Sequence, residues 1–169
     1  MERFFIADPY NDDHIRLIMD FEEKNQISPV TSTVLKNIRH TKTAQEYEIE
    51  TKESNEISQI LFLQAETYIT DSCHIQGEKD MKSCRIFFAP IAISSRNRKM
   101  VNLITDYVFD VLGMEDIFVT IPVKDANRSL IENLENKGFE NLGEDNGNIT
   151  YLKEKDIVKS NGKAVAFVA

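Results

Sequence analysis

The fold of this chain is decided at its centre, where residues 84–123 read CRIFFAPIAISSRNRKMVNLITDYVFDVLGMEDIFVTIPV. The two ends of this stretch, 84–93 and 116–123, are short apolar runs of the kind that form buried strands. Between them, apolar residues recur at helical spacing in one continuous stripe: Met100, Val101, Leu103, Ile104, Tyr107, Val108, Val111 and Leu112. We therefore predict a strand, a crossover helix and a second strand that runs parallel to the first.

The sequence before this stretch predicts a strand over 2–7 and then two helices. Asp12 and Asp13 can cap the first helix, and Ser28-Pro29 can begin the second. Residues 46–50 alternate glutamate with Tyr47 and Ile49, which predicts a strand with one wet face. A strongly apolar strand follows over 57–64 and can continue through 67–76. Short links join these strands, so we expect them to pair antiparallel.

After the central stretch, the sequence predicts a helix that begins at Asp125 or Asn127 and ends at Gly138. Phe139 is expected to be the first buried residue of a further strand, residues 140–148 are loop-like around Gly143 and Asn146-Gly147, and 149–154 form the last strand. The predicted fold class is α/β (α+β): a mixed sheet of about seven strands flanked by about four helices. We expect one domain over residues 1–155 and a C-terminal tail over 156–169.

Composition excludes several classes of function. Lys and Arg number 20 against 28 Asp and Glu, and a net charge of −8 disfavours binding to nucleic acid. No apolar run approaches the roughly 20 residues that span a bilayer, so no membrane partner is expected. Cys73 and Cys84 cannot build a disulfide framework and lack metal-ligand spacing. We expect a cytoplasmic protein without a metal.

The segment NRSLIENLENKGF, residues 127–139, carries a recognisable pattern. Gly138 follows Asn127 by eleven residues, a helix lies between them, and Phe139 comes next. In this respect, and in the order of its predicted elements over roughly residues 3–153, the chain resembles the GCN5-related N-acetyltransferase (GNAT) superfamily.

The resemblance implies an N-acyltransferase that uses acyl-CoA (acetyl-CoA) as co-substrate and passes the acyl group to an amine by direct attack in a ternary complex. It places the CoA site on the central strand, the loop after it and the start of the crossover helix. The implied binding residues are Ile91, Ile93, Arg96, Asn97, Arg98, Lys99, Met100 and Asn127. A helix N-terminus suits the CoA pyrophosphate, and a ladder broken at Pro90 would leave backbone groups for the pantetheine arm.

Two departures from the family pattern bear on activity. If Arg96 begins the phosphate loop, Lys99 and Val101 replace its two small residues, while the local cations can grip phosphate through side chains. Many members of the family carry a tyrosine seven residues after the Asn, where it can protonate the leaving thiolate. That position is Leu134 here, which cannot donate a proton. Leu134→Tyr is expected to raise turnover if the ring fits the cleft. A non-catalytic GNAT-fold domain that binds acyl-CoA or a protein partner is the alternative, and an interaction protein without CoA binding is a third.

The catalytic base is less well defined than the CoA site. Glu66 follows the apolar strand and could remove a proton from an amine, although most such residues are simply exposed. His74 has a suitable unperturbed pKa, but the sequence does not say which face of its strand it occupies. The acceptor amine and the oligomeric state stay open, with a homodimer as one alternative.

Overall fold

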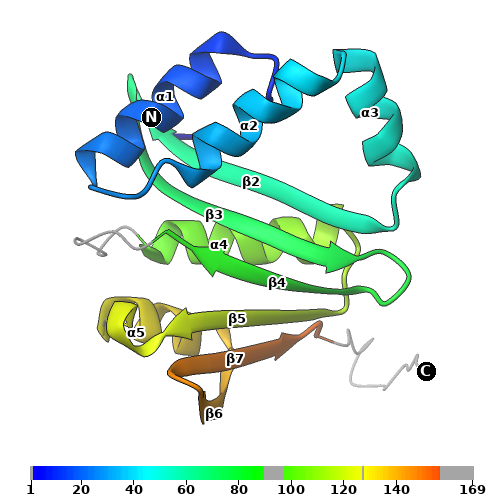
Figure 1. Ribbon diagram of the computed structural model, residues 1–169. Helices are drawn as coiled ribbons and strands as arrows, with labels where there is room; N and C mark the ends of the chain where they lie inside the picture. Colours follow the sequence, from blue (N-terminus) through cyan, green and yellow to red (C-terminus); the bar gives the residue numbers. More distant parts are fainter. Residues whose placement is uncertain (1, 90–96, 127, 157–169) are drawn as a thin grey trace.

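The computed structural model describes residues 2–89, 97–126 and 128–156. They form one seven-stranded sheet, and Figure 1 shows the helices that flank it. The strands are β1 (Glu2–Ile6), β2 (Glu56–Ala65), β3 (Tyr68–Glu78), β4 (Ser83–Phe88), β5 (Asp116–Pro122), β6 (Glu140–Asp145) and β7 (Asn148–Glu154). The helices are α1 (Asp12–Lys24), α2 (Val30–Thr41), α3 (Ala44–Glu53), α4 (Asn97–Asp106) and α5 (Arg128–Lys137). A π-helical turn, η1 (Tyr107–Val111), continues α4, and a 3-10 turn, η2 (Val123–Asp125), follows β5.

The predicted crossover is confirmed. The sheet order is β1-β2-β3-β4-β5-β7-β6, and β4 pairs with β5 in parallel, whereas every other pair is antiparallel. Helix α4 connects the two parallel strands, and its apolar stripe is buried at Met100, Ile104 and Val108. In the π-helical turn Phe109 is buried and Val111 is exposed, and Leu112 beyond the turn again packs against the core.

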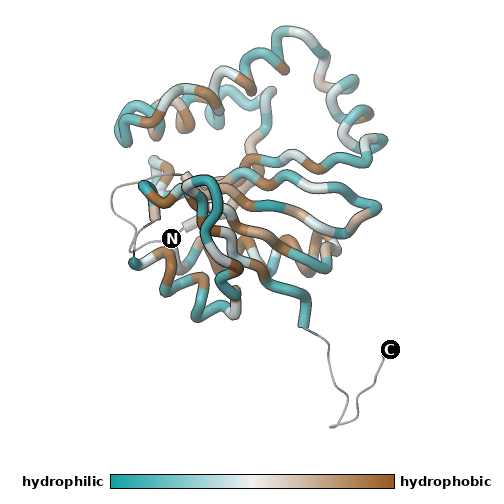
Figure 2. Tube along the Cα trace, turned by 60° about the horizontal axis from the view of Figure 1, so that its bottom comes forward, coloured by the Kyte–Doolittle hydropathy of each residue, from teal (hydrophilic) through white to brown (hydrophobic). Residues whose placement is uncertain are grey.

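Apolar residues on the two faces of the sheet form two separate cores. Helices α1 and α2 pack on one face, where Ile18, Phe21 and Leu35 meet Phe62. Helices α4 and α5 cover the other face and bury the larger core, which includes Ile75, Ile86, Val101, Ile104, Ile117 and Leu134. Figure 2 shows hydrophobic and hydrophilic residues alternating along both the helices and the strands.

The strand predicted over 46–50 is wrong, because these residues lie in helix α3. A capping box begins the helix: Thr43 Oγ1 accepts from the Glu46 N–H, and Glu46 Oε1 accepts from the Thr43 N–H at 2.9 Å. These bonds satisfy donors that are otherwise unpaired at a helix start. The local signal of Thr43 three residues before Glu46 outweighs an alternation that lasts only five residues.

Two further boundaries differ from the prediction. The run 57–76 forms two strands, because Glu66 adopts a left-handed conformation (φ 50°) in the turn between β2 and β3. The strand expected to begin at Phe139 is edge strand β6, which extends over 140–145, residues that read as a loop; every one of them is exposed, so no apolar alternation marks the strand. The division of 57–76 into two strands offsets the lost strand at 46–50, and the predicted total of about seven strands is confirmed.

The predicted strand 84–93 ends at Phe88 in β4, and the expected break at Pro90 lies outside the described residues. Of the helices within the described ranges, none is both long enough and apolar enough to span a membrane.

Candidate functional site

The two parallel strands at the centre of the sheet part towards their carboxyl ends. They pair only from Ser83 to Ile86 on β4 and from Asp116 to Val119 on β5. Beyond that point, the described pairing of β4 is to β3, and that of β5 is to β7. Figure 1 shows the divergence and places the start of α4 at the same end of the sheet. Strand ends at a switch in connectivity are where α/β sheets bind ligands, and a helix N-terminus favours anionic groups.

Most residues implied in CoA binding cannot be placed. Ile91, Ile93, Arg96 and Asn127 lie outside the described residues. The backbone of Asn97 and Arg98 begins α4, but their side chains also lie outside what the structure describes.

Lys99 and Met100 can be placed. Lys99 is exposed in the first turn of α4, and Met100 is wholly buried in the core under the same turn. A ligand at this turn could therefore reach the backbone of Met100 but not its side chain. The assignment of the whole set to CoA binding stays a prediction.

Glu66, the predicted base, lies at the tip of the β2–β3 hairpin. Its side chain is exposed, and its carbonyl oxygen accepts from Gln64 Nε2 at 3.0 Å. Leu134, at the position of the family's usual tyrosine, has no exposed surface and packs in the core under α4 and α5. The cleft that a tyrosine ring would need is therefore filled by packed side chains.

A cavity of about 120 Å³ lies between helices α1 and α2 and the sheet, beside the end of β4. Its walls include Phe21 and Glu22 of α1, Ser72 and His74 of β3, and Phe87, Phe88 and Ala89 at the end of β4. The cavity brings an acid and a histidine to the point where β4 leaves β5. Sequence reasoning considered His74 without its strand face and did not consider Glu22.

Glu22 is the unusual group in this cavity, because its side chain is 95% buried. One carboxylate oxygen, Oε2, accepts from the Ser32 N–H at 3.1 Å in the first turn of α2, whose N-cap Pro29 makes no side-chain cap bond. The other oxygen, Oε1, is buried without a hydrogen-bond partner among the described residues. A buried oxygen left in this way is costly, so the position suits a cationic ligand that would pair with it.

His74 is the second polar group in the cavity. Its Nε2 lies 3.0 Å from Ser58 Oγ, and its ring lies 6.4 Å from that of Phe87. Burial lowers the pKa of His74 below its ordinary value. The imidazole is therefore neutral near pH 7 and able to accept a proton.

His14 adds to the pH dependence of stability. Burial also lowers its pKa, and its Nδ1 accepts from the Asp8 N–H at 3.0 Å, a bond that protonation of that nitrogen would break. Because both histidines resist protonation in the folded state, the free energy of unfolding should fall as the pH falls below about 6.5, their unfolded value. We expect the double variant His14→Gln/His74→Gln to show a shallower fall between about pH 6.5 and 5 in urea unfolding. An unchanged slope would contradict this assignment.

The two cysteines and the acidic residues give no further site. Burial raises the pKa of Cys73 and raises that of Cys84 to about 12, so neither thiol is a thiolate near pH 7. Within residues 2–89, 97–126 and 128–156, no three His, Cys, Asp or Glu side chains form a group that could hold a metal ion.

Comparison of the sequence with protein-family models and with curated proteins gives no match. Among solved structures, the chain is similar to ribosomal-protein-S5-alanine acetyltransferase from Vibrio fischeri, with a TM-score of 0.68 at 12% identity over 92% of this chain and 93% of that one. It is also similar to the N-acetyltransferase PseH of Campylobacter jejuni in complex with acetyl coenzyme A (TM-score 0.61, 12% identity, 92% and 100% coverage). Spermidine N-acetyltransferase from Vibrio cholerae gives a TM-score of 0.60 at 15% identity, with 90% and 93% coverage. This chain has the fold of the GNAT N-acetyltransferases.

Proposed function

We propose that the protein is an N-acetyltransferase that uses acetyl-CoA as co-substrate and acetylates an amine. The observation that carries the proposal is the divergence of β4 from β5 beside a cavity that holds the buried carboxylate of Glu22. The shared fold supports it, since one of the similar structures is an N-acetyltransferase in complex with acetyl coenzyme A.

The residues divide into two groups on this proposal. The end of β4 and the start of α4 hold the CoA moiety, with Ile91, Ile93, residues 96–100 and Asn127 as the candidate contacts. The cavity on the side of α1 and α2 receives the acceptor, whose nitrogen is held by Glu22 and loses its proton to Glu22 or His74. A C–N bond then forms at the acetyl carbon as the C–S bond breaks.

The leaving group needs little help from the protein. With Leu134 buried in the core, this position supplies no proton to the departing sulfur. A thiol with a reference pKa of about 8.5 is a tolerable leaving group as its thiolate near neutral pH. We therefore expect positioning of the two substrates to provide most of the rate enhancement.

The buried Leu134 also favours one alternative, a non-catalytic domain that binds acyl-CoA. Both functions predict binding of acetyl-CoA, and only the first predicts transfer. An assay of free CoA thiol with a panel of amines therefore separates them, and calorimetric titration reports binding.

We expect acetyl-CoA to bind in the calorimeter, and the triple variant Arg96→Ala/Arg98→Ala/Lys99→Ala to bind about tenfold or more weakly. Hydrogen bonds to charged groups contribute about 1.5–3 kcal/mol each, so one true contact is enough for this loss. The control removes three exposed cations of α1, α2 and α3, Arg16, Lys36 and Lys52. Absence of binding to the unmodified protein would refute both functions. An equal loss of affinity in both triple variants would show that the basic residues do not contact CoA.

A further inference from the structure

A second and larger cavity, of about 410 Å³, adjoins the cavity that holds Glu22. The two share three wall residues, Thr31, Ile60 and His74. The larger cavity lies between α2, α3 and the β1–β2 part of the sheet, and its volume falls within the roughly 300–1,000 Å³ of small-molecule sites. A molecule that reaches the smaller cavity with one end can therefore extend into the larger one.

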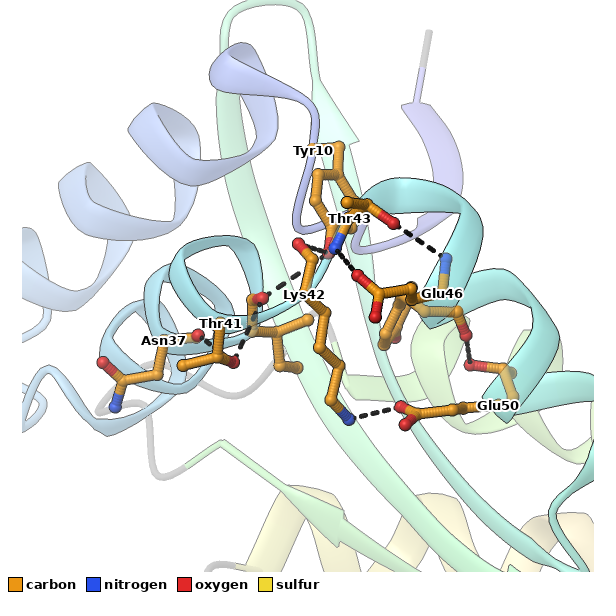
Figure 3. A network of polar contacts seen from close by, with 10 residues as sticks. Tyr10, Asn37, Thr41, Lys42, Thr43, Glu46 and Glu50 are labelled. Carbon is orange, nitrogen blue, oxygen red and sulfur yellow. Dashed lines mark hydrogen bonds and ion pairs between the residues drawn. The ribbon is translucent and has the colours of Figure 1, made fainter.

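Helix α3 forms one wall of this cavity through Tyr47 and Thr51, although none of its residues is fully buried. Polar contacts hold the helix in place, as Figure 3 shows. The Tyr10 hydroxyl donates to the Lys42 carbonyl oxygen at 2.8 Å, and Lys42 Nζ lies 2.5 Å from Glu50 Oε2. The ring of Tyr10 also lies 5.9 Å from that of Tyr47. The helix thus encloses the cavity while adding little to either core.

The walls of the larger cavity are mostly apolar, with Ile6, Ala7, Val30, Val34, Leu35 and Ile38 among them. Several of its polar side chains already bond within the protein. Ser58 pairs with His74, Thr51 Oγ1 donates to the Tyr47 carbonyl oxygen, and Gln59 Oε1 accepts from the Tyr107 hydroxyl. Exposed Asp8 accepts from the Tyr10 N–H. A hydroxylated or charged ligand body would therefore lose hydrogen bonds to water and regain few of them here.

We propose that the acceptor is a primary amine on an uncharged, apolar body, with its nitrogen at Glu22 and its body in the larger cavity. The inference rests on the proposed function, and it adds the class of the acceptor. Charge complementarity fixes the direction of binding. The 95% buried carboxylate with an unpaired oxygen lies in the smaller cavity, next to the end of β4, and the apolar walls lie behind it.

The test compares linear alkylamines from ethylamine to octylamine with spermidine, putrescine and glucosamine as acceptors. Each methylene that enters the cavity should raise kcat/KM by about fourfold, the equivalent of its transfer from water. The polar amines should react more slowly than hexylamine. Preference for a diamine, which Asp8 and Glu22 could hold at both ends, would overturn the inference and leave the proposed function standing.

A filled cavity provides the matched variant. Val34→Trp places a large ring at the cavity wall on α2, whereas Val111→Trp makes the same change at an exposed position on η1, which belongs to the opposite face. We expect Val34→Trp to lower kcat/KM for hexylamine by about tenfold or more, the equivalent of about two methylene contacts, with ethylamine little affected. Val111→Trp should change neither. Equal effects of the two variants would overturn the inference.

Binding of hexylamine alone, followed by NMR, keeps this test independent of catalysis. Titration should shift the signals of Thr31, Tyr47 and His74 in the unmodified protein and in Val111→Trp, and less in Val34→Trp. If no amine is acetylated but these shifts appear, the proposed function fails and the cavity still selects apolar amines. If the signals do not shift, the inference is wrong whatever the protein does with acetyl-CoA.

Discussion

Glu22→Gln should lower kcat/KM for acetyl transfer by about 100-fold or more and leave the protein folded. Proton transfer by a positioned side chain contributes about 10²–10⁴-fold to a rate, and here the same group would also hold the cationic acceptor. The glutamine keeps the volume of the side chain, and its amide oxygen can still accept from the Ser32 N–H. Its NH₂ group cannot accept a hydrogen bond from an ammonium ion.

The measurement is steady-state release of CoA thiol with the best amine of the panel, together with urea unfolding of each variant. Glu23→Gln is the matched control, because Glu23 is the next residue on α1 and is exposed. We expect the free energy of unfolding of Glu22→Gln to equal or exceed that of the unmodified protein, since a buried and half-paired charge is removed. An undiminished rate of acetyl transfer in Glu22→Gln would show that Glu22 has no catalytic role and only caps α2.

Glu22 shows why the sequence predicted the fold better than the site. Strand 84–88, helix 97–111 and strand 116–122 were predictable because apolar spacing alone distinguishes a buried strand from an amphipathic helix. Glu22 carries no such signal, since an acid near the end of an amphipathic helix is ordinarily exposed. It is buried because α2 returns across α1 and needs an acceptor at its first turn, a contact between residues 22 and 32 that no local pattern encodes.

The strand prediction for residues 46–50, which lie in helix α3, was wrong for a different reason. The alternation of Tyr47 and Ile49 with glutamate resembles a half-buried strand, but neither side chain enters the core. Without burial, local capping decides the conformation, and Thr43 with Glu46 provided a capping signal that was present in the sequence. Because α3 makes no core contacts, it can form one wall of a cavity, and sequence periodicity does not reveal that role.

Leu134→Ala should lower the free energy of unfolding by about 2–5 kcal/mol, the largest stability effect that we expect. Leu134 has no exposed surface and lies in the core between α4, α5 and the sheet, so its loss removes apolar contacts and leaves a void. Leu142→Ala is the control, since Leu142 on edge strand β6 is 53% exposed and its truncation should cost about 0.5 kcal/mol or less. Urea unfolding measures both, and equal costs would contradict the packing of α5.

The residue at position 134 also determines whether this helix can donate a proton to the leaving thiolate. Leu134→Tyr adds a ring and a hydroxyl to a filled core, so we expect a loss of about 1–3 kcal/mol in the free energy of unfolding and no gain in turnover. Faster turnover in this variant would require an open cleft at Leu134, and the buried leucine leaves no such cleft. Turnover should be compared at a urea concentration where both proteins are fully folded. A rise in kcat for Leu134→Tyr would mean that the ring reaches the sulfur and that bound acetyl-CoA opens the core at α5. Unchanged kcat would mean that the thiolate leaves without a proton from this helix, as the buried leucine implies.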